Sequence, residues 1–245
     1  MVKRLDLMKF REVEVEKILE YLSKCTDGFE NPKIVVIGGY ALRAFTAFSR
    51  YTRDCDFVLK KLDGWNLDRI QKLLLKGLSI EVFEKRGSYG FLRCIKLLEV
   101  DGRSAKISVD FMEGEVRGRT EEQIFLITEE FLQKATKVEI PVAGKEVEIF
   151  VPDYADYLLL KIMSVRPSDV RDVATLVWKN GIPDDVKERA KKALAHPEIL
   201  RKNVKLIIDD VSDKRFLDSW KGTFVTMEFT EKIREEVLKE LKKLL

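Results

Sequence analysis

The chain has 245 residues and a mass of 28.4 kDa, and 45% of its residues are apolar, enough to build one large or two modest domains around a buried core. It has 45 Lys and Arg against 42 Asp and Glu, so the net charge of +3 does not indicate a nucleic-acid binder and any polyanion site must be local. Three widely spaced cysteines fit neither a disulfide framework nor a Cys-x-x-Cys metal site, which predicts a reducing compartment.

The sequence contains no signal-peptide pattern and no uninterrupted run of about 18 apolar residues, so we expect a cytoplasmic protein without a membrane partner. Apolar residues at helical spacing predict an amphipathic helix over 7–25. The apolar run 33–37 predicts a buried strand, and Gly38-Gly39 turns it into a helix expected over 40–48. The next strand is expected over 55–59.

The remainder of the N-terminal half alternates between helical and strand patterns. Two segments on either side of Asp101-Gly102 predict a β-hairpin, and a second hairpin is centred on Ala143-Gly144-Lys145. The expected elements are a helix over 67–76, a strand over 79–84, hairpin arms over 91–100 and 105–112, a helix over 129–135, and hairpin arms over 138–142 and 146–151.

Beyond Pro152 the pattern is helical only. Helices are expected over 154–165, 169–179, 184–195, 197–208, 213–220 and 230–245. The sequence therefore predicts an α+β protein with a mixed-sheet domain over 1–151 and a helical domain over 152–245.

Asp54 and Asp56 begin the second expected strand, where alternate side chains share a face and Cα atoms two residues apart lie roughly 6.5 to 7 Å from each other. Two carboxylates at this spacing can share a cation, and Mg²⁺ suits such an oxygen-only site because it takes further ligands from water and phosphates. Asp-x-Asp also occurs in solvated turns. Here it follows a glycine pair and the basic residues Arg50 and Arg53.

Gly38-Gly39 stands at a strand-to-helix turn, where backbone N–H groups favour an anion and glycine lets a phosphate approach closely. The alternative is that the glycines only make the turn. Gly38-Gly39-x-Ala41-Leu42, followed by Arg50-x-Thr52-x-Asp54-x-Asp56-Phe57, resembles the first motif of the DNA polymerase beta superfamily of nucleotidyltransferases, in the form used by the abortive-infection (AbiEii-like) group.

The resemblance implies a nucleotidyltransferase fold with nucleotide phosphates at the glycine turn and two metal ions, Mg²⁺ or Mn²⁺, at three carboxylates. The third is expected to be Asp110, because Ile107, Val109 and Phe111 face one way along its strand and Asp110 the other. Glu99, Asp101 and Glu113 are the alternative candidates for this third carboxylate. Many members of the superfamily carry serine at the position of Gly39.

Lys161, Arg166, Asp169 and Asp172 match a signature of the same group, in which Ser168 replaces the usual lysine. A lysine on an apolar helix face is explained if it meets a buried anion, so Lys161 is the expected triphosphate contact. The alternative is a lysine that snorkels to solvent. Asp172 could orient Lys161, Arg166 or the sugar, and Asp169 could do the same or cap the helix.

The first hypothesis is a metal-dependent enzyme that moves a nucleoside monophosphate from a nucleoside triphosphate to a hydroxyl. Asp54, Asp56 and Asp110 would hold the metal, while Gly38, Gly39, Lys161 and either Arg50 or Arg53 would bind the triphosphate. The acceptor is open between an RNA or tRNA 3′ end, a protein and a small molecule, and the resemblance implies toxin-like action beside an antitoxin partner. The second hypothesis is a silent nucleotide- or nucleic-acid-binding module on the same fold.

Overall fold

The computed structural model describes residues 4–48, 50–60, 67–78, 80, 82–86, 89–100 and 102–245. The chain divides into two compact units. The first contains Met1–Ala44, Tyr51–Val116 and Ile127–Pro152, and the second contains Phe45–Arg50, Arg117–Leu126 and Asp153–Leu245. Two short segments that precede residue 151 therefore lie in the second unit. No helix in the described part of the chain is long and apolar enough to cross a bilayer.

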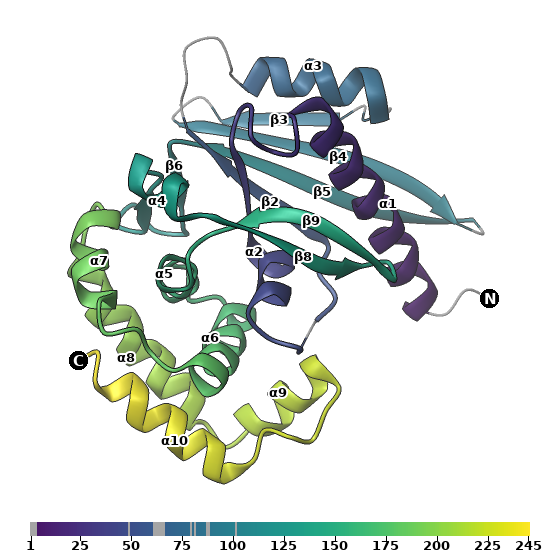
Figure 1. Cartoon of the computed structure of the whole chain (residues 1–245). Coiled ribbons are helices and arrows are strands. Elements are labelled where there is room, and N and C mark those ends of the chain that lie inside the picture. The colour runs from purple at the N-terminus through teal and green to yellow at the C-terminus, as the bar shows by residue number, and fades with distance from the viewer. Residues whose placement is uncertain are drawn as a thin grey trace. The chain divides into compact units, whose positions relative to one another are not determined.

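The first unit is built on a mixed five-stranded sheet with the order β1-β2-β5-β4-β3. Only β2 and β5 pair in parallel, and the other neighbours are antiparallel. Figure 1 shows β2, β5, β4 and β3 side by side. The bounds of the five strands are β1 Ile34–Ile37, β2 Asp54–Leu59, β3 Val82–Arg86, β4 Gly90–Val100 and β5 Arg103–Glu113. The α+β class with a mixed sheet is confirmed.

Helix α1 (Arg4–Cys25) packs on β5 and on the hairpin of β8 (Thr136–Val142) and β9 (Lys145–Val151), as Figure 1 shows. Helix α3 (Leu67–Leu78) packs on β4. On the face of the sheet that carries α1, the rings of Phe57 and Phe111 stack at 4.9 Å between centroids. The unit also contains α2 (Gly38–Ala41), a 3-10 turn (Leu42–Ala44) and α4 (Glu129–Lys134), while β6 spans Glu115–Arg117.

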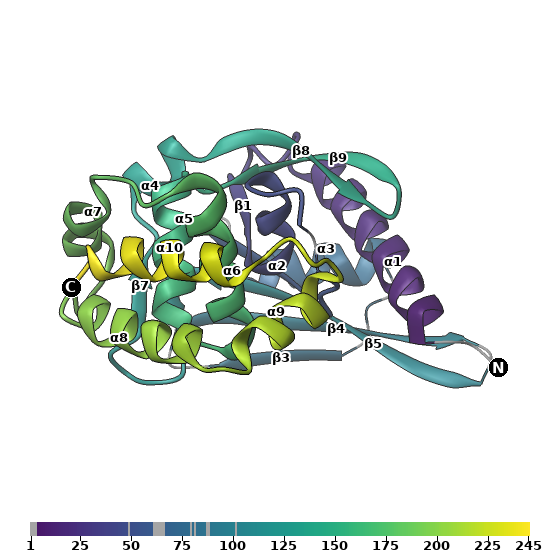
Figure 2. The ribbon, with the colours of Figure 1, turned by 90° about the horizontal axis from the view of Figure 1, so that it is seen from below.

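The second unit is a helical bundle. Its helices are α5 Tyr154–Ser164, α6 Pro167–Asn180, α7 Val186–Ala193, α8 Ile199–Ser212, α9 Phe216–Phe224 and α10 Glu231–Lys242, and β7 spans Ile124–Leu126. Figure 2 shows α10 running alongside α8, with which it packs. Trp220 lies fully buried among aromatic rings of this unit and donates its indole N–H to the Thr175 hydroxyl at 2.8 Å.

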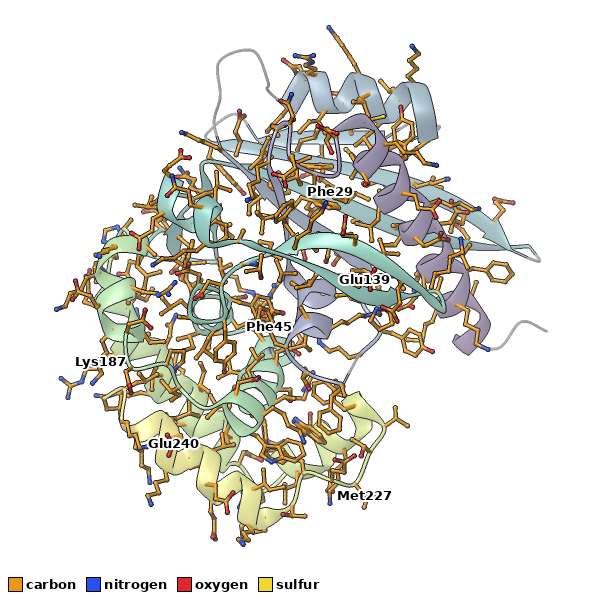
Figure 3. The ribbon with its side chains drawn as sticks, in the orientation of Figure 1. Phe29, Phe45, Glu139, Lys187, Met227 and Glu240 are labelled. Carbon is orange, nitrogen blue, oxygen red and sulfur yellow. The ribbon has the colours of Figure 1, made fainter. Side chains whose placement is uncertain are left out.

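The element types expected from the sequence agree with the structure, with one substantial difference. The helix expected over 40–48 is much shorter: α2 ends at Ala41 and the 3-10 turn that follows it ends at Ala44, after which the chain enters the helical unit. There Phe45, labelled in Figure 3, stacks on Tyr157 with ring centroids 4.9 Å apart, and Phe48 stacks on Trp178 at 5.2 Å. The short strands β6 and β7 were not expected. Residues 79 and 81, the start of the strand expected over 79–84, lie outside the described residues.

Candidate active site

The Asp-x-Asp pair lies at the start of β2, as expected. Cys55 and Phe57 are fully buried on the face that carries α1, so Asp54 and Asp56 project from the opposite face. Asp54 is exposed and Asp56 is partly buried. The hydroxyl of Thr52 donates to the backbone oxygen of Asp54 at 3.1 Å and so ties the entry of the strand.

The parallel pairing of β2 with β5 brings the third predicted carboxylate to the pair. Asp56 lies opposite Asp110, and neighbouring strands run about 4.8 Å apart, so both side chains leave the sheet side by side on one face. Asp110 is only 4% exposed. Of its competitors, Glu113 lies opposite Leu59 and faces the other way, and Glu99 lies at the far end of β4. Asp101 lies outside the described residues.

The glycine pair is required by close contacts. Gly38 has φ +72°, and a Cβ atom there would stand 2.0 Å from Oδ2 of Asp56. A Cβ atom on Gly39 would stand 3.0 Å from the Cβ of Thr52. Any side chain at position 38 would therefore displace the Asp56 carboxylate. Because α2 has only four residues, its dipole is small, and a phosphate contact at the glycines stays a prediction.

Arg93 was not expected at this site. It lies on β4 opposite Asp110 and makes a bidentate ion pair with it, with Nε 2.8 Å from Oδ1 and Nη2 2.6 Å from Oδ2. The hydrogen bonds to Asp110 are the largest cause of the raised pKa of Arg93. Within the described residues, no group of three or more His, Cys, Asp or Glu side chains is arranged to hold a metal ion.

A sequence signal could have identified Arg93. The Asp101-Gly102 turn predicts a two-residue hairpin loop, which fixes the pairing of Val100 with Arg103 and, counted back along both arms, of Arg93 with Asp110. A cation directly opposite a buried carboxylate follows from that register.

Lys161 lies in the second unit at the centre of a buried ionic network. Its ammonium nitrogen is 2.9 Å from Oδ1 of Asp169 and 2.8 Å from Oδ2 of Asp172, and the residue is 3% exposed. The snorkelling alternative is therefore wrong. The buried anions that explain this lysine are carboxylates of the chain itself, and its contact with a triphosphate stays a prediction. Helix capping by Asp169 is also wrong, since α6 begins after Arg166 and Asp169 bonds side chains instead.

Arg50 completes the network from the segment that precedes β2. Its Nε and Nη2 atoms each lie 2.8 Å from the Asp172 carboxylate, and Ser164 and Arg166 donate to Asp169 at 2.7 and 2.6 Å. Burial alone would raise the pKa of Asp172, but Lys161 and Arg50 outweigh it and hold that pKa below its ordinary value. Arg50, Lys161 and Asp172 thus form one charged cluster, in which Asp172 contacts Lys161, one of the alternatives left open by the sequence.

Arg53, the second predicted basic residue, is exposed beside Asp54. Its backbone oxygen accepts from the N–H of Ser108 at 3.4 Å. Arg11 of α1 is an additional basic residue here, since the charges of Arg53 and Asp54 both act on it. Burial is the main cause of its lowered pKa; Arg53 lowers that pKa further and Asp54 raises it. Positive and negative groups therefore meet at the entry of β2.

The carboxylate cluster matches the donor chemistry of a hard divalent cation. Asp54, Asp56 and Asp110 present oxygen atoms only, on one face of two adjacent strands, and Gly38 leaves room that a Cβ atom would fill. The Arg93 guanidinium already bonds both Asp110 oxygens, so a cation there would compete with it. Their oxygen-only chemistry is of the kind that Mg²⁺ or Mn²⁺ prefers, but these described residues are not arranged as a metal site in this structure, so a metal ion here stays a prediction.

Comparisons with known proteins find a family model and solved structures that resemble this chain. The model of a family described as "Nucleotidyltransferase of unknown function (DUF6036)" matches residues 13–193. A crystal structure of a "putative nucleotidyltransferase" from H. pylori is 14% identical, with a TM-score of 0.48 and coverage of 100% of this chain and 99% of that one. The structure of JHP933 from Helicobacter pylori is 12% identical, with a TM-score of 0.40 and coverage of 86% and 81%. No curated protein matches the sequence.

Proposed function

The chain belongs to this family of nucleotidyltransferases, and we propose that it is a Mg²⁺- or Mn²⁺-dependent enzyme that transfers a nucleoside monophosphate from a nucleoside triphosphate to a hydroxyl. The observation that carries the proposal is the register of β2 with β5, which sets Asp110 beside Asp56. The finer resemblance to the abortive-infection group also stays a proposal, as does cytoplasmic, toxin-like action beside an antitoxin-type protein.

In the proposed reaction the acceptor oxygen forms a bond to the α-phosphorus while the bond from that phosphorus to the bridging oxygen of pyrophosphate breaks. The hydroxyl proton passes to the Asp110 carboxylate and then to solvent. A divalent cation held by Asp54, Asp56 and Asp110 supplies charge neutralisation for the triphosphate. Gly38, Gly39 and Arg53 bind the phosphate oxygens through backbone N–H groups and a guanidinium.

The charged residues of the helical unit have a different proposed role. Arg50, which is held by Asp172, anchors the segment that leads into Thr52 and Asp54. Lys161 fixes Asp172 from the other side. We propose that this network presents Arg50 and Lys161 to the nucleotide, as the sequence predicts.

The test is transfer of label from each α-³²P nucleoside triphosphate, with Mg²⁺ or Mn²⁺, to total tRNA, cellular protein or small-molecule hydroxyls. We expect a labelled product and pyrophosphate from the wild type. The double variant Asp54→Asn with Asp56→Asn should form neither. Glu99→Gln removes an exposed carboxylate from the far end of β4 and should leave transfer unchanged.

Label transfer that survives the double variant would refute the assignment of these carboxylates. Nucleotide binding without transfer to any acceptor, unaffected by Asp110→Asn, would favour the silent binding module instead. The nature of the labelled acceptor decides between RNA, protein and small-molecule substrates.

A further inference from the structure

Four charged residues form one row across the sheet of the first unit. Asp56 of β2 lies opposite Asp110 of β5, Asp110 lies opposite Arg93 of β4, and Arg93 lies opposite Glu84 of β3. Residues directly opposite each other in neighbouring strands leave the sheet on the same face. The single positive charge of the row therefore stands between one carboxylate of the candidate metal site and one outside it.

Arg93 occupies the oxygens that a metal ion would need. Its two hydrogen bonds use both oxygens of Asp110, at 2.8 and 2.6 Å. A bidentate guanidinium–carboxylate pair is among the stronger charge-assisted contacts in proteins. Asp110 is almost completely buried, so its ionised carboxylate would be costly to leave without a cation.

Arg93 can leave without losing every partner. Its side chain is 31% exposed, against 6% for the side chain of Asp110. Glu84 is exposed and lies one strand further on, about 4.8 Å across the sheet. The charge of Glu84 already acts on Arg93, although the hydrogen bond to Asp110 is the dominant influence. The ring of Phe91, whose centre is 5.6 Å from the guanidinium carbon, lies on the same face.

We propose that Arg93 is an exchangeable counter-ion, which neutralises Asp110 in the metal-free protein and moves to Glu84 when a divalent cation takes the Asp110 oxygens. The proposal rests on the proposed function, since it assumes that Asp54, Asp56 and Asp110 bind that cation. It makes Arg93 a positioning residue that couples metal entry to a shift of positive charge along the sheet.

The test measures Mn²⁺ affinity of the full-length protein by the electron paramagnetic resonance signal of free Mn²⁺. Arg93→Gln removes the competing cation and should bind Mn²⁺ about tenfold more tightly than the wild type. Glu84→Gln removes the carboxylate with which Arg93 would pair after it leaves Asp110, and this variant should bind Mn²⁺ about two- to fivefold more weakly. In the double variant, Glu84→Gln should have no further effect.

Lys96→Gln is the matched control. It removes a positive charge from the same strand, but Lys96 pairs with Glu14 at 2.6 Å on the opposite face, so Mn²⁺ affinity should stay within twofold. Arg93→Lys keeps the charge without the bidentate geometry and should give an intermediate affinity. Circular dichroism spectra check that each variant is folded.

The outcomes separate the two proposals. If the wild type binds Mn²⁺ and folded Arg93→Gln or Arg93→Lys binds it equally or more weakly, the counter-ion proposal is overturned and the metal site remains. The same holds if Glu84→Gln weakens binding equally in the presence and absence of Arg93. If neither the wild type nor Arg93→Gln binds Mn²⁺, the metal site of the proposed function fails, and the counter-ion proposal fails with it.

Discussion

Replacement of Lys161 by Met tests what the buried network does. The ammonium group lies between two carboxylates with no exposed side-chain surface, and removal of one partner from a buried ion pair typically costs about 3–5 kcal/mol. Asp172 keeps its two bonds from Arg50, and Asp169 keeps its bonds from Ser164 and Arg166. We therefore expect the lower end, about 3 kcal/mol, which lowers the melting temperature by about 6–12 °C in a chain of this size.

The loss should depend on pH. Burial would raise the pKa of Asp169, but Lys161 and Arg166 lower it below its ordinary value, and Asp172 is shifted in the same direction. Carboxyl groups with a depressed folded-state pKa contribute stability that is complete above the unfolded value of about 4 and is lost as the pH falls further. The difference in melting temperature between Lys161→Met and the wild type should thus be largest near pH 7 and shrink below about pH 4.

Thermal unfolding followed by circular dichroism measures the effect, with Lys191→Met as an exposed control that should change stability by less than about 0.5 kcal/mol. A loss below 1 kcal/mol for Lys161→Met, or one that does not vary with pH, would refute the structural account. Calorimetric titration with ATP tests the sequence prediction separately. If Lys161 contacts the triphosphate, the variant loses nucleotide affinity even at temperatures where it is fully folded.

Two further substitutions test individual contacts. Gly38→Ala should lower the free energy of unfolding by about 2 kcal/mol or more and abolish label transfer, because its Cβ atom meets the Asp56 carboxylate at a positive φ. Gly144→Ala is the control, since Gly144 has a similar φ of +81° but its Cβ atom would have no atom within 4 Å. This control should show only the backbone strain of about 1–2 kcal/mol. Equal effects in urea unfolding would contradict this close contact. Asn203→Ala should cost about 1–3 kcal/mol in the same assay, because the Asn203 amide donates at 3.1 and 3.0 Å to two buried carbonyls near the end of α5, and an unchanged midpoint would show that water replaces the amide.

Local patterns were sufficient to predict most of the sheet and the position of the carboxylates. Asp54 and Asp56 stand at the head of an apolar run, and the Asp-Gly turn places Asp110 within a strand of fixed alternation. The parallel pairing that sets Asp56 opposite Asp110 joins residues 54 positions apart, and no local pattern encodes it. The resemblance to a known superfamily, rather than the periodicity of the sequence, indicated that Asp110 joins Asp54 and Asp56.

The end of the helix after Gly39 was missed for a related reason. Residues 45–48 have a composition that permits a helix, but the rings of Phe45 and Phe48 gain more from packing on Tyr157 and Trp178. Tertiary burial of aromatic surface outweighs a local helix preference of a few tenths of a kcal/mol per residue.

Pairing of Lys161 with two aspartates could have been predicted from the sequence, since Asp169 and Asp172 lie one turn apart on a helix.

The path of the chain implies that the two units unfold together. The segment 45–50 belongs to the helical unit, yet residues on both sides of it belong to the sheet unit. It is anchored by Phe48 on Trp178 and by Arg50 on Asp172, and only Tyr51, Thr52 and Arg53 separate it from the strand that begins at Asp54. Loss of the helical unit therefore releases the entry of the carboxylate strand.

We expect a single unfolding transition. In a Trp65→Phe background, tryptophan fluorescence reports on Trp178 and Trp220 of the helical unit, while circular dichroism reports on all elements of both units. The two signals should change at the same urea concentration, and Lys161→Met should shift both midpoints by the same amount. If the fluorescence transition alone moved to lower urea and the dichroism signal kept a second, unshifted transition, the units would be independent, and the anchored segment would not connect the stability of the ionic network to that of the carboxylate site.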